Sequence, residues 1–349
     1  MSYPIDGNLH NLSYPVIEDG RFFNHRNETK PRFFSSALFS MIWWQIKNRL
    51  RRVDTVPWVG RSPLIARSMK PQITWLGHST FLIQFGGFNI LTDPIAENLS
   101  PLFKRTLPFG APLDELPEID FVLISHNHRD HMDAHTLREI VGNNPRASFL
   151  IPQGTRSWFS ERGFDRTYEC MWWDNHRFNA PLGIDSRIEF SFVPAHHWSQ
   201  RWLDDRNKTL WGGWMMTCQD TKIYFVGDSA YTHFFKQINS VFKPIDIVLM
   251  PIGPCEPREF MRHAHVDARE SVQAFLDLEA THFIPMHWGT FLLGADYFLT
   301  PLEQVKKVWD QRLVGPLCQL HIPRIGERIA PLECVGVKDQ VDTSVYKTF

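Results

Sequence analysis

The segment 126–131 reads HNHRDH and places three histidines and one aspartate within six positions. Imidazole and carboxylate groups are common ligands of transition metals in proteins. The spacing H-x-H-x-D-H lets one short loop present ligands to two metal ions at once. The alternative is a histidine-rich polar loop on the surface. Further ligands elsewhere in the chain are needed to decide between the two.

Such ligands follow four predicted strands. Each strand is a short apolar run that ends one or two positions before a residue able to bind a metal. Ligands at several strand ends converge at one rim of a sheet sandwich, where the strands hold them rigidly. The strands and the ligands that follow them are 120–125 with His126, 188–195 with His196 and His197, 222–226 with Asp228, and 282–286 with His287.

Further elements complete the expected fold. Gly86-Gly87 joins two strands, 80–85 and 88–93, into a hairpin. One helix is expected after the metal loop, and Asp267 with Glu270 forms a capping box that opens another. Additional strands are predicted over 73–76 and 246–251. Strands mixed with helices in two runs indicate an α/β (α+β) fold, an αββα four-layer sandwich of two packed sheets with helices outside.

Composition limits the classes of function. The 349 residues are 43% hydrophobic and 21% charged, with a net charge of −1, which is typical of a globular protein and does not favour a nucleic-acid partner. The five cysteines form no C-x-x-C pair, as expected of free thiols in a reducing compartment. Neither a signal peptide nor a transmembrane run is present, so a cytoplasmic-side location is expected. The 13 Trp and 27 Phe fit a large core, an apolar ligand or a membrane-facing patch.

Residues 1–70 are interpreted as an N-terminal extension, 71–330 as the hydrolase domain and 331–349 as a C-terminal tail. Within the extension, 33–52 has apolar residues at helical spacing and a basic cluster at its C-terminal end. An aromatic apolar face beside basic residues is typical of a helix at a membrane surface. A helix packed on the domain gives the same pattern, so both interpretations stand.

The order of these motifs resembles the metallo-β-lactamase superfamily, and within it the N-acylphosphatidylethanolamine-hydrolysing phospholipase D family. The resemblance covers residues 72–291, and GRFFN at 20–24 resembles a short element before the family's catalytic domain. The matching stretches are TWLGHST (74–80), LTDPI (91–95), LISHNHRDHMD (123–133), HW (197–198), DDRNKTLWGGW (204–214), FVGDS (225–229), PIGPCEPREFMRHAHVD (251–267) and MHWGTF (286–291).

The resemblance implies seven ligands and two Zn²⁺ per chain. Histidine-rich ligands favour zinc, and a di-iron relative would carry Glu in place of His128. His197 is preferred to His196 because it directly precedes Trp198, as in the family's HW pair. Two zinc ions about 3.5–4 Å apart would share a hydroxide that attacks phosphorus. The implied ligands are His126, His128 and His197 for one metal, Asp130, His131 and His287 for the other, and Asp228 between them.

Three residues form the predicted catalytic set: the ligand Asp130 and two others, His265 and Asp93. His265 is expected to contact the phosphate or protonate the leaving oxygen, with a structural loop histidine as the alternative. Asp93 is expected to orient a ligand histidine, or else to stabilise a turn. His78 is expected to bond near the metal loop. Arg201 and Arg258 are further candidates for holding phosphate.

The implied reaction is hydrolysis of N-acylphosphatidylethanolamine to N-acylethanolamine and phosphatidic acid. Its expected partners are a phospholipid, a membrane surface and, from relatives, a second copy of the chain. One alternative is a lactonase or phosphodiesterase of this fold that acts on a small, sugar-phosphate-like substrate. A nuclease is disfavoured because the only basic cluster lies at 47–52. A non-catalytic scaffold would have lost ligands, and all seven are present.

Overall fold

The computed structural model describes residues 3–4, 12–25, 43, 55–101, 103–180, 185–312, 315 and 317–329. The predicted helix over 33–52, apart from Trp43, and the tail over 331–349 lie outside these residues. In the described part of the chain, no helix combines the length and apolar character needed to cross a bilayer.

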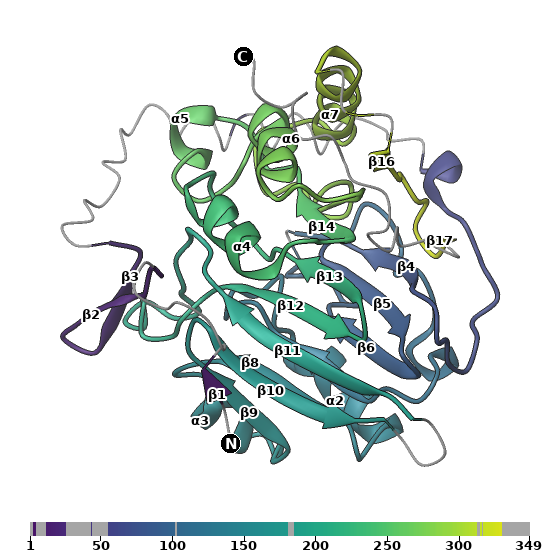
Figure 1. The fold of residues 1–349 in the computed structure, drawn as a ribbon, viewed down its shortest axis with the longest axis vertical. Coiled ribbons are helices and arrows are strands. Elements are labelled where there is room, and N and C mark those ends of the chain that lie inside the picture. The colour runs from purple at the N-terminus through teal and green to yellow at the C-terminus, as the bar shows by residue number, and fades with distance from the viewer. Residues whose placement is uncertain are drawn as a thin grey trace.

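Two mixed sheets form the centre of the described structure (Figure 1). The seven-stranded sheet has the order β17 (Arg328–Ile329), β4 (Gln72–Gly77), β5 (Thr80–Phe85), β6 (Phe88–Thr92), β7 (Phe121–Leu123), β8 (Ser148–Pro152) and β9 (Thr167–Cys170). The eight-stranded sheet has the order β1 (Tyr3–Pro4), β10 (Asp174–Asn179), β11 (Arg187–Val193), β12 (Gly213–Cys218), β13 (Thr221–Phe225), β14 (Ile247–Pro251), β15 (His282–Met286) and β16 (Gln319–Leu320).

Helices cover the outer faces of both sheets (Figure 1). Two of them, α2 (Ala134–Asn143) and α3 (Arg156–Ser160), lie on one side of the molecule. The others lie on the opposite side, so the predicted αββα sandwich is confirmed. They are α4 (Phe234–Phe242), α5 (Arg258–Met261), α6 (Ala268–Asp277) and α7 (Thr300–Gln311).

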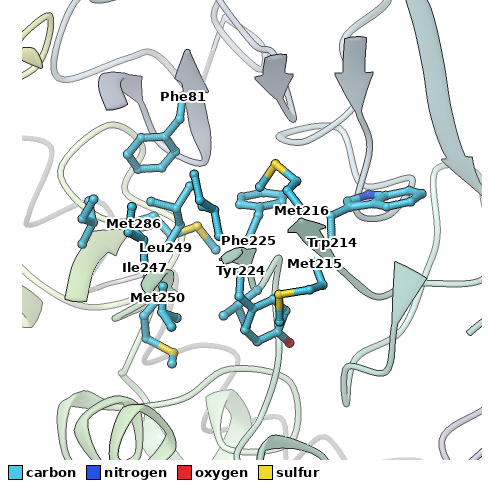
Figure 2. Packing of buried hydrophobic residues seen from close by; sticks show 14 of the residues in the cluster. Phe81, Trp214, Met215, Met216, Tyr224, Phe225, Ile247, Leu249, Met250 and Met286 are labelled. Carbon is cyan, nitrogen blue, oxygen red and sulfur yellow. The ribbon is translucent and has the colours of Figure 1, made fainter. Parts of the chain in front are cut away.

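The alternation of side chains along each strand explains the layers. On β5, Phe81 belongs to the large central cluster, whereas the next residue, Leu82, belongs to a separate cluster with Leu137 of α2. On β14, Leu249 and Met250 point to opposite sides (Figure 2). Both faces of each sheet are therefore apolar, as a sandwich between helical layers requires.

The predicted strands match the observed ones to within two residues at each end; the prediction 120–125, for example, becomes the shorter β7. Gly86 and Gly87 take φ values of 59° and 82° and connect β5 to β6, as a tight hairpin requires. The side chain of Asp267 accepts the backbone N–H of Glu270, and the capping box of α6 is complete. Strands β6 to β8 pair in parallel, as do β13 to β15. Within each sheet, the carboxyl ends of these strands therefore meet at one edge.

The described part of residues 1–70 also contacts the domain. β1 pairs with β10 at the edge of the eight-stranded sheet. A hairpin of β2 (Val16–Glu18) and β3 (Arg21–Phe23) lies against the loop that follows β11, where the N–H of Phe22 donates to the carbonyl of Asn207 at 2.8 Å. This loop also carries His197.

Candidate metal centre

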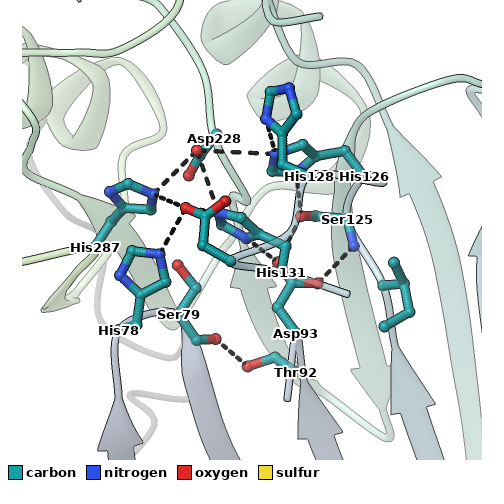
Figure 3. Close-up of polar contacts among 12 residues, drawn as sticks. His78, Ser79, Thr92, Asp93, Ser125, His126, His128, His131, Asp228 and His287 are labelled. Carbon is teal, nitrogen blue, oxygen red and sulfur yellow. Dashed lines mark hydrogen bonds and ion pairs between the residues drawn. The ribbon is translucent and has the colours of Figure 1, made fainter. Parts of the chain in front are cut away.

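Four loops at the strand ends bring the predicted ligands together. Figure 3 shows the ligands His126, His128, His131, Asp228 and His287, which come from three of these loops. The loop after β7 carries the HNHRDH segment. The loops after β11, β13 and β15 carry His197, Asp228 and His287, respectively. Gly227, directly before Asp228, has a φ of 67°, which lets the chain turn sharply at the end of β13.

Three imidazoles form one half of the centre. His126 Nε2 lies 2.8 Å from His128 Nδ1, and His197 Nε2 lies 3.3 Å from the same atom. The three side chains are close enough to share one ion, since their ligand atoms all lie within 4.8 Å of one another. The rings of Trp198 and His128 pack edge to face, with centroids 4.4 Å apart.

The other half combines a carboxylate with imidazoles. Asp130 Oδ2 lies 3.4 Å from His131 Nε2 and 3.6 Å from His287 Nε2. His78 Nε2 contacts the same oxygen at 3.1 Å. The expected bond between His78 and the metal loop is therefore present.

Asp228 lies between the two halves (Figure 3). Its Oδ2 is 3.1 Å from His287 Nε2 and 3.3 Å from His131 Nε2. The same oxygen is 4.0 Å from His126 Nε2 and 3.8 Å from His197 Nε2. One buried carboxylate thus faces imidazoles of both halves, which is the position that a bridging ligand needs.

Groups outside the set of candidate ligands fix the orientation of the imidazoles. His131 Nδ1 lies 2.7 Å from Asp93 Oδ2, and Ser125 Oγ lies 2.8 Å from His126 Nδ1. On the far side, His197 Nδ1 lies 2.9 Å from the carbonyl of Ala264. Each of these rings therefore turns its Nε2 toward the centre.

The two halves differ in their electrostatics. Burial lowers the pKa of His128 to about 3 and that of His197 to about 4. Burial also acts to lower the pKa of His131, but the carboxylates of Asp228 and Asp130 outweigh it and raise that pKa well above its ordinary value. The three-histidine half is therefore neutral at pH 7 and ready to donate lone pairs to a metal.

The residues present fit divalent metal binding. Within the described structure, buried atoms that face this centre make no hydrogen bond; they include His131 Nε2, His265 Nδ1, His287 Nε2 and Asp228 Oδ1. Buried polar atoms without partners are rare in folded proteins and call for a missing ion or water. Imidazoles with few carboxylates are the donor set that zinc and its transition-metal neighbours prefer.

The comparisons with known proteins agree with this geometry. Residues 88–288 match the family described as "Beta-lactamase superfamily domain". The chain is 33% identical over 251 residues to N-acyl-phosphatidylethanolamine-hydrolyzing phospholipase D 1 of Caenorhabditis elegans, covering 68% of this chain and 70% of that protein. The chain belongs to the N-acylphosphatidylethanolamine-hydrolysing phospholipase D family. It is an enzyme, a metal-dependent hydrolase of the metallo-β-lactamase superfamily.

Two further similarities support this membership and the fold. The mitochondrial N-acyl-phosphatidylethanolamine-hydrolyzing phospholipase D of Saccharomyces cerevisiae is 34% identical over 263 residues, covering 73% of this chain and 54% of that protein. The isothiocyanate hydrolase from Delia radicum gut bacteria shares the fold with a TM-score of 0.56 at 16% identity, covering 74% of this chain and 98% of that one.

In this member of the family, His265 lies at the rim of the centre. Its Nδ1 is 3.7 Å from Asp228 Oδ2, and its ring centroid is 5.1 Å from that of His197. It precedes α6, as the sequence predicts. His196 is placed differently, because its backbone N–H donates to Ser229 Oγ at 3.0 Å and its ring lies beside His25 rather than among the ligands.

Both arginines proposed for phosphate binding contact the protein instead. Arg201 donates to the backbone carbonyls of Asn127 at 2.9 Å and Met132 at 2.7 Å, so it braces the metal loop from outside. Arg258 contacts Glu270 and donates to the carbonyl of His265 at 2.9 Å. The sequence did not predict these contacts of Arg201 and Arg258, because their acceptors lie in distant segments or are backbone carbonyls.

Proposed function

We propose that the chain hydrolyses N-acylphosphatidylethanolamine to N-acylethanolamine and phosphatidic acid, with two zinc ions in the centre described above. The position of Asp228 between two imidazole clusters carries the proposal, because it supports a pair of metals rather than one. Membership in the family supports the lipid substrate. Water supplies the oxygen of the new P–O bond, and the bond from phosphorus to the ethanolamine oxygen breaks.

Each group in the centre has a proposed part in this reaction. His126, His128 and His197 would hold one zinc ion. Asp130, His131 and His287 would hold the second, with Asp228 between the two ions. When bound, the zinc ions supply Lewis acidity that polarises a phosphoryl oxygen.

The residues around the ligands have two further proposed tasks. Asp93 keeps His131 in one orientation. His265, within 3.7 Å of Asp228, is placed to contact the phosphate or to hand a proton to the leaving ethanolamine oxygen.

A membrane surface is the proposed source of the lipid. Trp202 and Leu203 lie in the loop that follows His197, and they are 59% and 100% exposed. The guanidinium of Arg129, on the metal loop itself, lies 5.0 Å from the ring of Trp202. An exposed indole and a leucine beside an arginine fit the boundary between acyl chains and anionic headgroups. This loop would present the headgroup directly to the neighbouring metal loop.

The test is an assay of the purified full chain with micelles that contain N-acylphosphatidylethanolamine in ¹⁸O-labelled water. We expect the label in phosphatidic acid and not in N-acylethanolamine. His128→Ala and Asp228→Asn should each lower turnover by more than about 100-fold, because even changes outside the ligand set cost about 10–100-fold. His135→Ala is the matched control, since this histidine is exposed on α2 and should retain wild-type turnover.

A parallel assay with bis(p-nitrophenyl) phosphate separates the lipid reaction from hydrolysis of a small soluble diester. Zinc-loaded protein that hydrolyses this compound but not the lipid would contradict the proposed substrate. Unchanged lipid turnover in both ligand variants would contradict the metal mechanism.

A further inference from the structure

A buried asparagine from the N-terminal segment contacts the backbone of a candidate metal ligand. Asn24, the last residue of GRFFN, is 5% exposed. Its Nδ2 donates to the carbonyl of His197 at 2.9 Å, and its Oδ1 accepts the N–H of His197 at 3.2 Å. The same Oδ1 accepts the indole N–H of Trp211 at 2.9 Å. One amide therefore satisfies both backbone groups of a residue 173 positions later in the chain.

These contacts matter because His197 lies beyond the end of β11 and just after the isolated bridge between His196 and Ala230, and its own N–H and carbonyl both bond to Asn24. The ring of His197 is oriented by Nδ1, which lies 2.9 Å from the carbonyl of Ala264. That bond sets the rotation of the ring but not the position of the Cα atom. The amide of Asn24 restrains the backbone N–H and carbonyl of His197 directly. With both in place, Nε2 lies 3.3 Å from His128 Nδ1.

The segment that carries Asn24 is itself fastened to the domain at two places. At one end, Ser13 accepts the indole N–H of Trp173 at 2.8 Å through its carbonyl, and its own N–H donates to Gln237 Oε1 at 3.1 Å. Near the other end, Phe22 is 6% exposed and donates its N–H to Asn207 at 2.8 Å. Because the segment is hydrogen-bonded to the domain at both ends, the side chain of Asn24 is held at a defined position beside His197.

We propose that Asn24 is a positioning residue for His197, and that the N-terminal segment thereby completes the three-histidine half of the metal centre. The inference rests on the proposed function only in taking His197 as a ligand. The segment that precedes the hydrolase domain is then part of the metal-binding structure rather than a separate extension. Loss of the amide should let His197 shift and weaken the binding of one metal ion.

The experiment measures zinc binding rather than activity. Metal-free wild type, Asn24→Ala and Asn24→Asp are titrated with zinc against a chromophoric chelator, and the visible spectrum of each Co²⁺ form is recorded. Asn24→Ala should lose about 10-fold in the affinity of one site, as typical for lost groups that orient ligands, and its Co²⁺ bands should change in intensity. Asn24→Asp keeps the acceptor and loses the donor, so its affinity should lie between the other two.

The matched control is Asn175→Ala. Asn175 is also buried, at 2% exposure, but its amide donates to Glu189 in the eight-stranded sheet rather than to the metal centre. Asn175→Ala should lower the Tm of the metal-free protein and leave zinc affinity unchanged. If both alanine variants lower Tm and neither changes zinc affinity or the Co²⁺ spectrum, Asn24 is only structural and the proposal is wrong.

Three other outcomes are also decisive. If Asn24→Ala does not fold, wild-type affinity in Asn24→Asp overturns the proposal, and a reduced affinity supports it. If zinc binding weakens as expected while the wild-type enzyme fails to hydrolyse N-acylphosphatidylethanolamine, the substrate proposal fails and the role of Asn24 stands. Unchanged zinc affinity in His197→Ala would remove the basis of the inference.

Discussion

Asp93 Oδ2 lies 2.7 Å from Nδ1 of His131, and both side chains are completely buried. Asp93 in turn accepts the backbone N–H of Ser125 at 2.7 Å and its hydroxyl at 2.5 Å. A carboxylate at this distance holds the proton on Nδ1 and leaves Nε2 as the metal-facing atom. The strand pair β6 and β7 thus sets the tautomer of a candidate ligand through two residues at their ends.

Asp93→Asn should therefore weaken metal binding. An amide can turn its NH₂ toward His131 and favour the wrong tautomer, so we expect a loss of about 10–100-fold in zinc affinity or turnover. Zinc content and kcat/KM report the effect. Asp174→Asn is the control, because Asp174, the first residue of β10, accepts the backbone N–H of Met171 at 2.8 Å and does not touch the centre. Wild-type zinc affinity and turnover in Asp93→Asn would contradict the orienting role.

His265→Gln tests the proposed contact with phosphate or the leaving oxygen. The variant should keep two zinc ions per chain and lose about 10²–10⁴-fold in kcat, the range typical of a lost general acid. Its KM should change little if the contact forms mainly in the transition state. His263→Gln, two positions earlier and exposed, should behave as the wild type. Equal kcat values for the two variants would assign His265 a structural role.

Much of the metal centre could be predicted from sequence because its ligands occupy fixed places relative to strands. Each lies at the end of an apolar run, and parallel pairing of β13, β14 and β15 brings two of these ends to one edge. The HNHRDH loop needs no tertiary information at all, since its spacing already places four ligands together. The family resemblance then decided between His196 and His197, which strand periodicity left open.

The contacts that hold the ligands were not predictable in the same way. Asn24 is 173 residues from His197, and no local pattern relates the two positions. Arg201 donates to backbone carbonyls, and because every residue has one, the sequence does not identify these acceptors. The GRFFN motif marked the segment without showing its partner. Such contacts depend on how separate loops pack, which the periodicity of single elements does not specify.

Gly227→Ala should destabilise the fold and disturb Asp228. A Cβ atom at this position would lie 2.7 Å from the carbonyl oxygen of Gly212 and 2.8 Å from Ser125 Cβ, at a φ of 67°. We expect a loss of about 1–3 kcal/mol in unfolding free energy, measured by urea denaturation, together with weaker zinc binding. Gly142→Ala is the matched control, since a Cβ there meets nothing within 4 Å on the exposed side of α2. It should stabilise the protein by up to about 1 kcal/mol, and the opposite ranking of the two variants would refute this account.

His176 should make stability depend on pH between about 6.5 and 4. Burial in β10, beside Tyr168 and Phe178, lowers its pKa from 6.5 to about 4. Between pH 4 and pH 6.5, His176 is protonated in the unfolded chain but neutral in the folded chain. The contribution of His176 to stability is therefore complete above pH 6.5 and is lost as the pH falls toward 4, with a slope of at most about 1.4 kcal/mol per pH unit. His176→Phe removes the titrating group, so its unfolding free energy should fall less steeply than that of the wild type when both are measured in urea at equal zinc content. Parallel pH profiles for the two proteins would show that the imidazole of His176 protonates as readily in the folded chain as in the unfolded one.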